Sequence, residues 1–126
     1  KKTDVKGVET MLVKTKPGGT QCVFRNLAET HLPYWNEGAP WDAGYNPCVP
    51  FRDGNDAAEA RRRQIACIEY CDAGLVPLLE RFAEDTVIVC ADHGDCGGED
   101  GLWAHGVSHA KTLEVPLLFR LAAMEQ

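Results

Sequence analysis

The apolar positions toward the two ends of the chain fall into short runs bounded by turn residues. Runs at residues 6–15 and 21–28 each predict a strand, and residues 16–19 (Lys-Pro-Gly-Gly) predict the turn that closes the first one. Two further runs predict strands at residues 86–91 and 115–120. Runs this short are typical of strands, because an amphipathic helix usually needs about ten residues or more.

The middle of the chain has the spacing of a helix. From Asn55 or Asp56, either of which can cap the helix, apolar residues recur every three or four positions. The predicted apolar face, which Asp72 interrupts, consists of Ile65, Ile68, Leu75, Leu79 and Phe82. Pro77 predicts a kink or the start of a second helix. Because this helix leads into the strand at 86–91, the order of elements predicts a parallel βαβ crossover.

Residues 36–55 are rich in Gly, Pro, Asn and Asp and predict a long loop. A loop of that length in a compact domain usually serves as a lid or a substrate wall. The aromatic residues in and beside it either line such a wall or pack in the core: Tyr34, Trp35, Trp41 and Tyr45. Residues 61–63, three consecutive arginines, form a solvated helix face or bind phosphate.

Composition limits the class of protein. With 126 residues, 44% of them hydrophobic and 25% charged, residues 1–126 are expected to form a single globular domain. A net charge of −6 argues against a nucleic-acid partner, and no apolar run is long enough for a membrane span or resembles a signal peptide. The expected location is therefore cytoplasmic.

The six cysteines do not form a CxxC pattern, so a structural zinc ribbon is not indicated and a reducing compartment is favoured. Cys90 lies within the predicted strand at 86–91 and is expected to be a buried thiol. Cys67 and Cys71 are four residues apart on the predicted helix and share one face, as core residues or as a soft zinc pair.

The strongest candidate for chemistry follows the strand at 86–91. That apolar run ends in Asp92-His93-Gly94-Asp95, and a polar, glycine-rich segment extends from Gly97 to Gly106. Ligands of open α/β sheets bind at the carboxyl ends of strands, so the position suits metal ligands. Imidazole and carboxylate groups together suit Zn²⁺ or Mn²⁺. A helix cap or a salt-bridged turn is the structural alternative for Asp92 and His93.

Several motifs resemble those of one enzyme group. Residues 92–95, Gly98-Glu99, His105-Gly106 and residues 114–117 (Glu-Val-Pro-Leu) resemble the C-terminal signature of the alkaline phosphatase superfamily. The closer likeness is to its branch of sulfatases, lipoteichoic-acid synthases and phosphoethanolamine transferases. Residues 28–34 are similar to an upstream His-x-Pro-Tyr/Phe segment, and residues 69–79 to the helix before the metal strand, so the likeness covers roughly residues 20–120. The resemblance implies a partial α/β sandwich with a mostly parallel sheet.

The resemblance also implies roles for individual residues. Asp92 and His93 would bind a divalent metal (Zn, Mn, Mg or Ca), and His31 and His105 would contact the phosphate or sulfate of an ester substrate. In two-metal members, histidines at comparable places help to bind a second metal. Asp95 or Glu99 could orient a ligand imidazole. The metal would activate a nucleophile and neutralise charge on the transferred group.

Two features of the family have no counterpart in this sequence: a strand with further acidic ligands, and a Ser, Thr or Cys nucleophile at a helix start. Thr30 is a poor nucleophile candidate because adjacent residues of a strand face opposite ways, and Glu29 resembles an upstream acidic ligand only by position. The chain is therefore expected to be the C-terminal part of a larger metalloenzyme, inactive without its N-terminal segment. An uncovered sheet edge could also pair in a homo-oligomer.

Two alternatives remain open on the sequence. The first is a phosphomutase-like enzyme with two metals. The second is a non-catalytic domain that binds a metal or a partner. His109, four residues after His105, could join it on one helical face, but a surface role is the simpler expectation.

Overall fold

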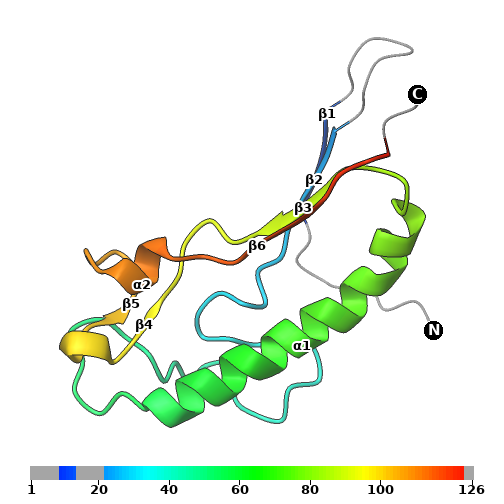
Figure 1. Cartoon of the computed structure of the whole chain (residues 1–126). Helices are drawn as coiled ribbons and strands as arrows, with labels where there is room; N and C mark the ends of the chain where they lie inside the picture. The colour runs from blue at the N-terminus through cyan, green and yellow to red at the C-terminus, as the bar shows by residue number, and fades with distance from the viewer. Residues whose placement is uncertain (1–8, 14–21, 124–126) are drawn as a thin grey trace.

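The computed structural model describes residues 9–13 and 22–123. Strands β1 (Glu9–Val13) and β2 (Cys22–Asn26) form an antiparallel hairpin in which Met11 lies opposite Phe24 (Figure 1). The two predicted N-terminal strands are thus confirmed, with narrower bounds. The predicted turn at 16–19 lies outside the described residues.

Helix α1 (Ala57–Arg81) begins where its cap predicts. The Asp56 side chain accepts a hydrogen bond from the backbone N–H of Glu59 at 3.0 Å, which satisfies one of the free donors of the first turn. The helix continues through Pro77 to Arg81, so no second helix begins there.

The buried face of α1 differs from the predicted apolar face. Ile65 and Ile68 are exposed, whereas the buried residues of the helix are Ala60, Arg63, Cys67 and Cys71. Ala60 and Cys67 on this face pack with Tyr34 and Cys48 of the long loop and its start. Core packing of the two cysteines is confirmed.

Arg63 of α1 forms hydrogen bonds that hold the long loop against the helix. Its guanidinium pairs with Glu59 at 2.7 Å and donates to the backbone carbonyls of Asp42 (3.2 Å) and Tyr45 (2.8 Å). With 2% of its surface exposed, it is not part of a solvated arginine face. The loop is therefore fixed against the helix by a buried, fully paired cation.

The expected mostly parallel sheet is wrong. The described strands form three two-stranded sheets, and all three are antiparallel. Strand β3 (Val87–Cys90) pairs with β6 (Leu117–Arg120) in a ribbon, with Ile88 opposite Phe119. The two strands were predicted, but β6 runs back along β3 because the intervening segment makes a short excursion and returns.

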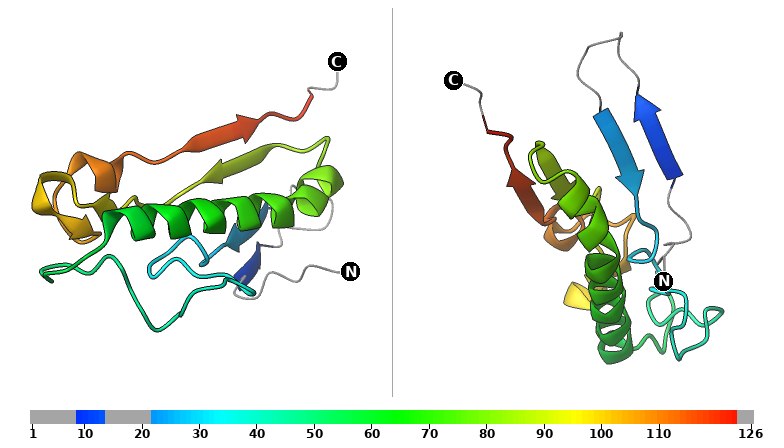
Figure 2. Two further views of the ribbon diagram at one scale, coloured as in Figure 1. Left: turned by 90° about the horizontal axis from the view of Figure 1, so that it is seen from below. Right: turned by 90° about the vertical axis from the view of Figure 1, so that its right-hand side faces the viewer.

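The parallel crossover is also wrong, because α1 does not bring β2 beside β3. In both views of Figure 2 the β1–β2 hairpin is separate from the β3–β6 ribbon, and no pairing joins β2 to β3 among the described strands. The described residues therefore do not form the predicted partial α/β sandwich. Cys90, predicted to be buried in such a sheet, is exposed.

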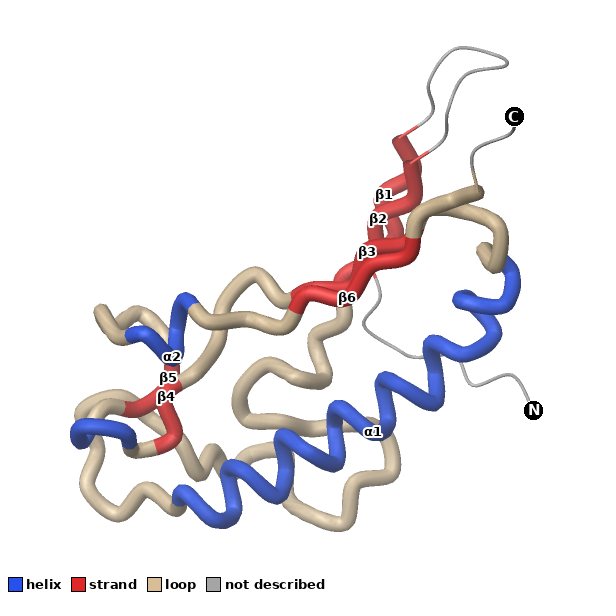
Figure 3. The backbone as a smooth tube through the Cα atoms, viewed as in Figure 1, coloured by secondary structure: helices blue, strands red, loops and turns tan. Residues whose placement is uncertain are grey.

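The excursion between β3 and β6 contains short elements. They are β4 (Cys96–Gly97), the 3₁₀ turn η1 (Glu99–Gly101), β5 (Trp103–Ala104) and α2 (Ala110–Leu113). Figure 3 shows them near the N-terminal end of α1, connected mostly by loops. Gly98 is required there, because its φ is +112° and a Cβ would lie 3.1 Å from the Trp103 ring.

A small core lies where this excursion, the long loop and α1 meet. It comprises Tyr34, Cys48, Ala60, Cys67 and Ala104, with Leu32, Trp41 and Trp103 packed against it. Within the described part of the chain, no helix has the length and apolar character needed to cross a membrane.

Candidate metal centre

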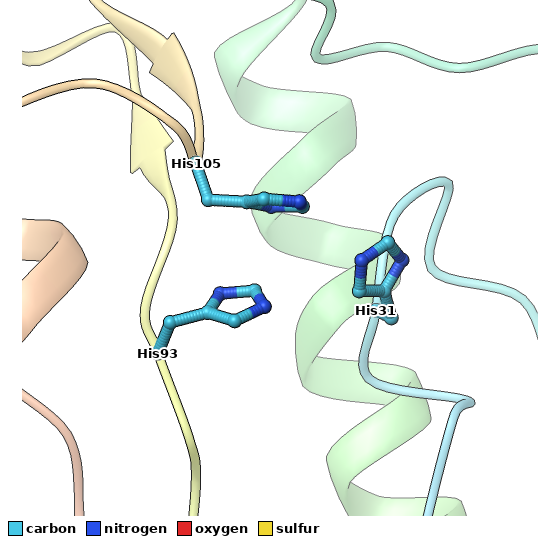
Figure 4. Close-up of side chains that lie close together, drawn as sticks. All are labelled: His31, His93 and His105. Atoms are coloured by element: carbon cyan, nitrogen blue, oxygen red, sulfur yellow. The ribbon is translucent and has the colours of Figure 1, made fainter.

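Three histidines from separate segments converge on one point. His31 follows β2, His93 lies between β3 and β4, and His105 follows β5 (Figure 4). One potential ligand atom from each histidine lies within 4.8 Å of those of the other two. The ring centroids of His93 and His105 are 4.2 Å apart, and that of His31 lies 4.9 Å from His105 and 5.8 Å from His93. Residues 74 positions apart in the sequence thus share one site.

A tight turn places His31. Its backbone N–H donates to the carbonyl of Ala28 at 3.0 Å, and its own carbonyl accepts from the N–H of Tyr34 at 2.8 Å. The turn ends with Tyr34 at a φ of +57°, in the left-handed region that non-glycine residues rarely adopt. These bonds hold the imidazole at the start of the long loop.

The backbone of Gly94 places His93. The Gly94 N–H donates to the carbonyl of Thr112 at 3.1 Å, and a Cβ on Gly94 would lie 2.1 Å from the carbonyl oxygen of Lys111. Only glycine permits that approach, so the requirement at this position is close contact with the α2 backbone. The contact fixes the loop that carries His93.

In all three rings Nδ1 takes part in a hydrogen bond, and Nε2 is left free as the possible metal ligand. Nδ1 lies 2.9 Å from the carbonyl oxygen of Leu32 in His31 and 3.0 Å from that of Gly94 in His93. In His105, Nδ1 lies 2.7 Å from Oδ1 of Asp95. Each partner is an acceptor, so Nδ1 carries the proton and Nε2 retains the lone pair that a metal needs.

Asp95 is the buried carboxylate of the site. Its side chain is 6% exposed, and its second oxygen, Oδ2, accepts a hydrogen bond from the Tyr34 hydroxyl at 2.9 Å. Of the two residues expected to orient a ligand imidazole, Asp95 contacts the imidazole of His105, and its role toward a metal ligand stays a prediction. Glu99 instead accepts from the Gly97 N–H at 2.6 Å, and backbone N–H bonds from Glu99 and Gly97 lower the pKa of its carboxyl.

Asp92 lies at the edge of the centre. Its side chain is 89% exposed, and Oδ1 accepts a hydrogen bond from the backbone N–H of His93 at 3.0 Å. The same oxygen lies 3.9 Å from Nε2 of His93. Its role as a ligand therefore stays a prediction, and the three histidines are the residues that the fold itself brings together.

Two other candidate residues, His109 and Glu29, make their contacts outside the group of three histidines. His109 caps α2 by accepting from the N–H of Lys111 at 3.0 Å, and its Nε2 pairs with Asp100 at 3.3 Å, which confirms a surface role. Glu29 is buried, and its Oε2 makes no hydrogen bond. Burial, followed by the negative charge of Glu29, raises the pKa of Cys71 to about 11, so this carboxylate lies toward the thiols of α1.

The aromatic residues of the long loop pack partly in the core. Tyr34 is buried in the core and Trp41 packs against it. A shallow depression lies between the loop and the excursion, lined by Pro50, Phe51, Arg52, Asp53, Gly101, Leu102, Trp103 and Val107. None of the three histidines lines it, so this depression is separate from the candidate metal centre.

Three neutral imidazoles can hold a divalent metal ion. Zinc sites with three protein ligands leave a fourth position open for water or substrate. At Zn–N bond lengths of about 2.1 Å, tetrahedral ligands are about 3.4 Å apart, so the rings need only a modest contraction to bind.

The three histidines expected around one ester site are brought together in the structure. The expected division of roles, with His93 beside Asp92 on the metal and His31 and His105 on the substrate, stays a prediction. A common signal was present: a glycine or proline follows each of them within two residues, as expected for side chains held on tight turns. The Tyr34 contact with Asp95 had no sequence signal, because it joins residues 61 positions apart.

Comparison with known proteins finds no matching family model, no similar curated protein and no similar solved structure.

Proposed function

We propose that this chain carries a divalent metal site of a phosphate- or sulfate-ester hydrolase or transferase. His31, His93 and His105 are the proposed imidazole ligands, and Asp92 is a fourth, carboxylate ligand. The observation that carries this proposal is that all three Nδ1 atoms have acceptor partners while the rings converge.

The donor set favours zinc among the candidate metals. Imidazole nitrogen is a borderline ligand that suits Zn²⁺, whereas Mg²⁺ and Ca²⁺ prefer sites made of oxygen atoms. The contact between His105 and Asp95 is the carboxylate–histidine arrangement that commonly supports a metal-binding imidazole. Manganese is the second choice, because the proposed Asp92 ligand supplies a carboxylate oxygen.

The ester chemistry follows from what such a site provides. A bound metal supplies a Lewis acid that polarises a phosphoryl or sulfuryl oxygen and offsets its negative charge. The chain has a net charge of −6, which disfavours the approach of an anionic ester, and a bound cation would offset this locally. His31, His93 and His105 would hold the metal, which would supply that positive charge to the ester.

Metal titration of the purified protein tests the proposal. We expect one equivalent of zinc by calorimetry, and a loss of affinity of about 100-fold or more in each of H31A, H93A and H105A. His109→Ala is the matched control, because His109 lies outside the group, and it should bind zinc like the unsubstituted protein. Equal zinc affinity in H93A and H109A would refute the site.

A structural role for the metal is the alternative, because the same ion would connect three separate loops. Turnover of p-nitrophenyl phosphate and p-nitrophenyl sulfate by the zinc-loaded protein separates the two. Zinc-dependent turnover that H105A abolishes supports the hydrolase. A zinc-dependent rise in Tm without turnover supports the structural role.

A further inference from the structure

We infer that Tyr34 is a positioning residue of the proposed metal centre: through Asp95, its hydroxyl fixes the tautomer of His105 that presents Nε2 to the metal. The inference rests on the proposed function. The contacts that support it form a continuous chain from Tyr34 to Asp95 and from Asp95 to His105, at 2.9 and 2.7 Å.

The two oxygens of Asp95 have separate partners. Oδ1 accepts from Nδ1 of His105, and Oδ2 accepts from the hydroxyl of Tyr34. With one donor on each oxygen, the carboxylate cannot rotate without breaking both bonds. Because a carboxylate only accepts, the Asp95 end of this chain selects the Nδ1–H form of His105.

Tyr34 is itself held firmly. It is 3% exposed, its carbonyl accepts from the indole N–H of Trp41 at 2.9 Å, and its N–H donates to the carbonyl of His31. Burial and the adjacent charge of Asp95 raise the pKa of the phenol, so the hydroxyl remains a donor. Tyr34 therefore acts as a fixed donor toward Asp95.

Tyr34 also connects the segments that carry His31 and His105. It closes the turn that carries His31, and its hydroxyl reaches the carboxylate that orients His105. Loss of the hydroxyl should release Asp95 and let His105 exchange between tautomers, while the packing of the ring remains. This effect distinguishes a positioning role from a purely structural one.

Tyr34→Phe tests the inference, with Tyr45→Phe as the control. Tyr45 is half exposed and its ring lies 5.3 Å from the guanidinium of Arg63, apart from the Asp95 contacts. Long-range ¹H–¹⁵N spectra of the metal-free protein report which His105 nitrogen is protonated, and the resonance is assigned by its loss in H105A. We expect Nδ1–H to predominate in the unsubstituted protein and in Y45F, and a mixture of tautomers in Y34F.

Zinc affinity provides the second readout. Substitution of groups that orient a ligand typically weakens metal binding 10- to 100-fold. Tyr34 is one step farther away, so Y34F should weaken zinc binding about threefold to tenfold, and Asp95→Asn should weaken it more. An unchanged His105 tautomer in Y34F would overturn the inference even if zinc binds. A changed tautomer in a protein that binds no zinc would uphold the positioning role and refute the proposed metal site.

Discussion

The β3–β6 ribbon and the end of the molecule that carries the histidines are organised in opposite ways. At the histidine end, Tyr34, Cys48, Cys96 and Ala104 are buried, and polar side chains bond to one another or to the backbone. Along the ribbon, Leu117, Leu118 and Phe119 are 62–66% exposed. Polar contacts between distant segments thus organise one end, while apolar side chains remain uncovered at the other.

The difference shows which end of the molecule is held together by contacts within this chain. The site is held by local bonds at turns and by close approach of backbone to backbone, and these need nothing from the ribbon. The ribbon resembles an interior strand pair in composition, but most of its side chains are exposed. Contiguous exposed apolar surface of this kind usually marks a contact with another polypeptide.

Gly94→Ala should have the largest effect on stability and zinc binding at the histidine end. The new Cβ would lie 2.1 Å from the carbonyl oxygen of Lys111, so the His93 loop must move away from α2. We expect about 3 kcal/mol of lost stability in urea unfolding and loss of zinc binding. Gly38→Ala is the control, because its φ is +91° but its surroundings are open, and about 1 kcal/mol is expected. Equal effects of the two substitutions would contradict the close contact.

Removal of the Arg63 side chain should have a slightly smaller effect. Arg63→Ala leaves two loop carbonyls and Glu59 without their buried donor, so about 2–3 kcal/mol of stability should be lost. Arg62 makes a similar pair with Glu59 from an exposed position, and Arg62→Ala should change little. Similar losses in both variants would show that the loop is not anchored through Arg63.

Acid should weaken the same anchor. Hydrogen bonds from Arg62 and Arg63 lower the pKa of Glu59 from 4.5 to about 2. The folded pKa is the lower one, so this contribution to stability is complete above about pH 4.5 and is lost as the pH falls toward 2. Urea unfolding between pH 6 and 3 should show a smaller acid-induced loss in Glu59→Gln than in the unsubstituted protein. An identical pH profile would refute the assignment.

The ribbon should give the smallest effect on the site. In the double variant Leu118→Lys/Phe119→Lys, one charge is placed on each face of β6, because adjacent strand residues face opposite ways. Both positions are exposed, so stability should change by about 0.5 kcal/mol or less and zinc affinity should not change. Sedimentation velocity should show less self-association than for the unsubstituted protein. Loss of zinc binding would show that the two ends are not independent.

Local features of the fold were predictable, and long-range ones were not. The Asp56 cap and the strands β2, β3 and β6 depend on neighbouring residues, and their patterns appear in the sequence. The pairing of β3 with β6 depends on the path of the 26 residues between them, which hydrophobic spacing does not encode. Burial of Cys67 in place of Ile68 depends on the loop that covers the helix, so periodicity alone selected the wrong face.

The residues of the candidate site were predictable, but the contacts that hold them together were not. His31, His93 and His105 could each be selected from their motifs, and Asp95 from its spacing to them. Their convergence depends on three loops that pack around Tyr34 and on the contact of Gly94 with α2. Neither interaction has a sequence spacing from which it could be inferred.

X-ray absorption at the zinc edge of the zinc-loaded protein tests the central claim most directly. Three imidazole nitrogens should appear at about 2.0–2.1 Å, with oxygen completing the shell and no sulfur. Sulfur at about 2.3 Å would place the metal on cysteines such as Cys67 and Cys71 and would contradict the histidine centre.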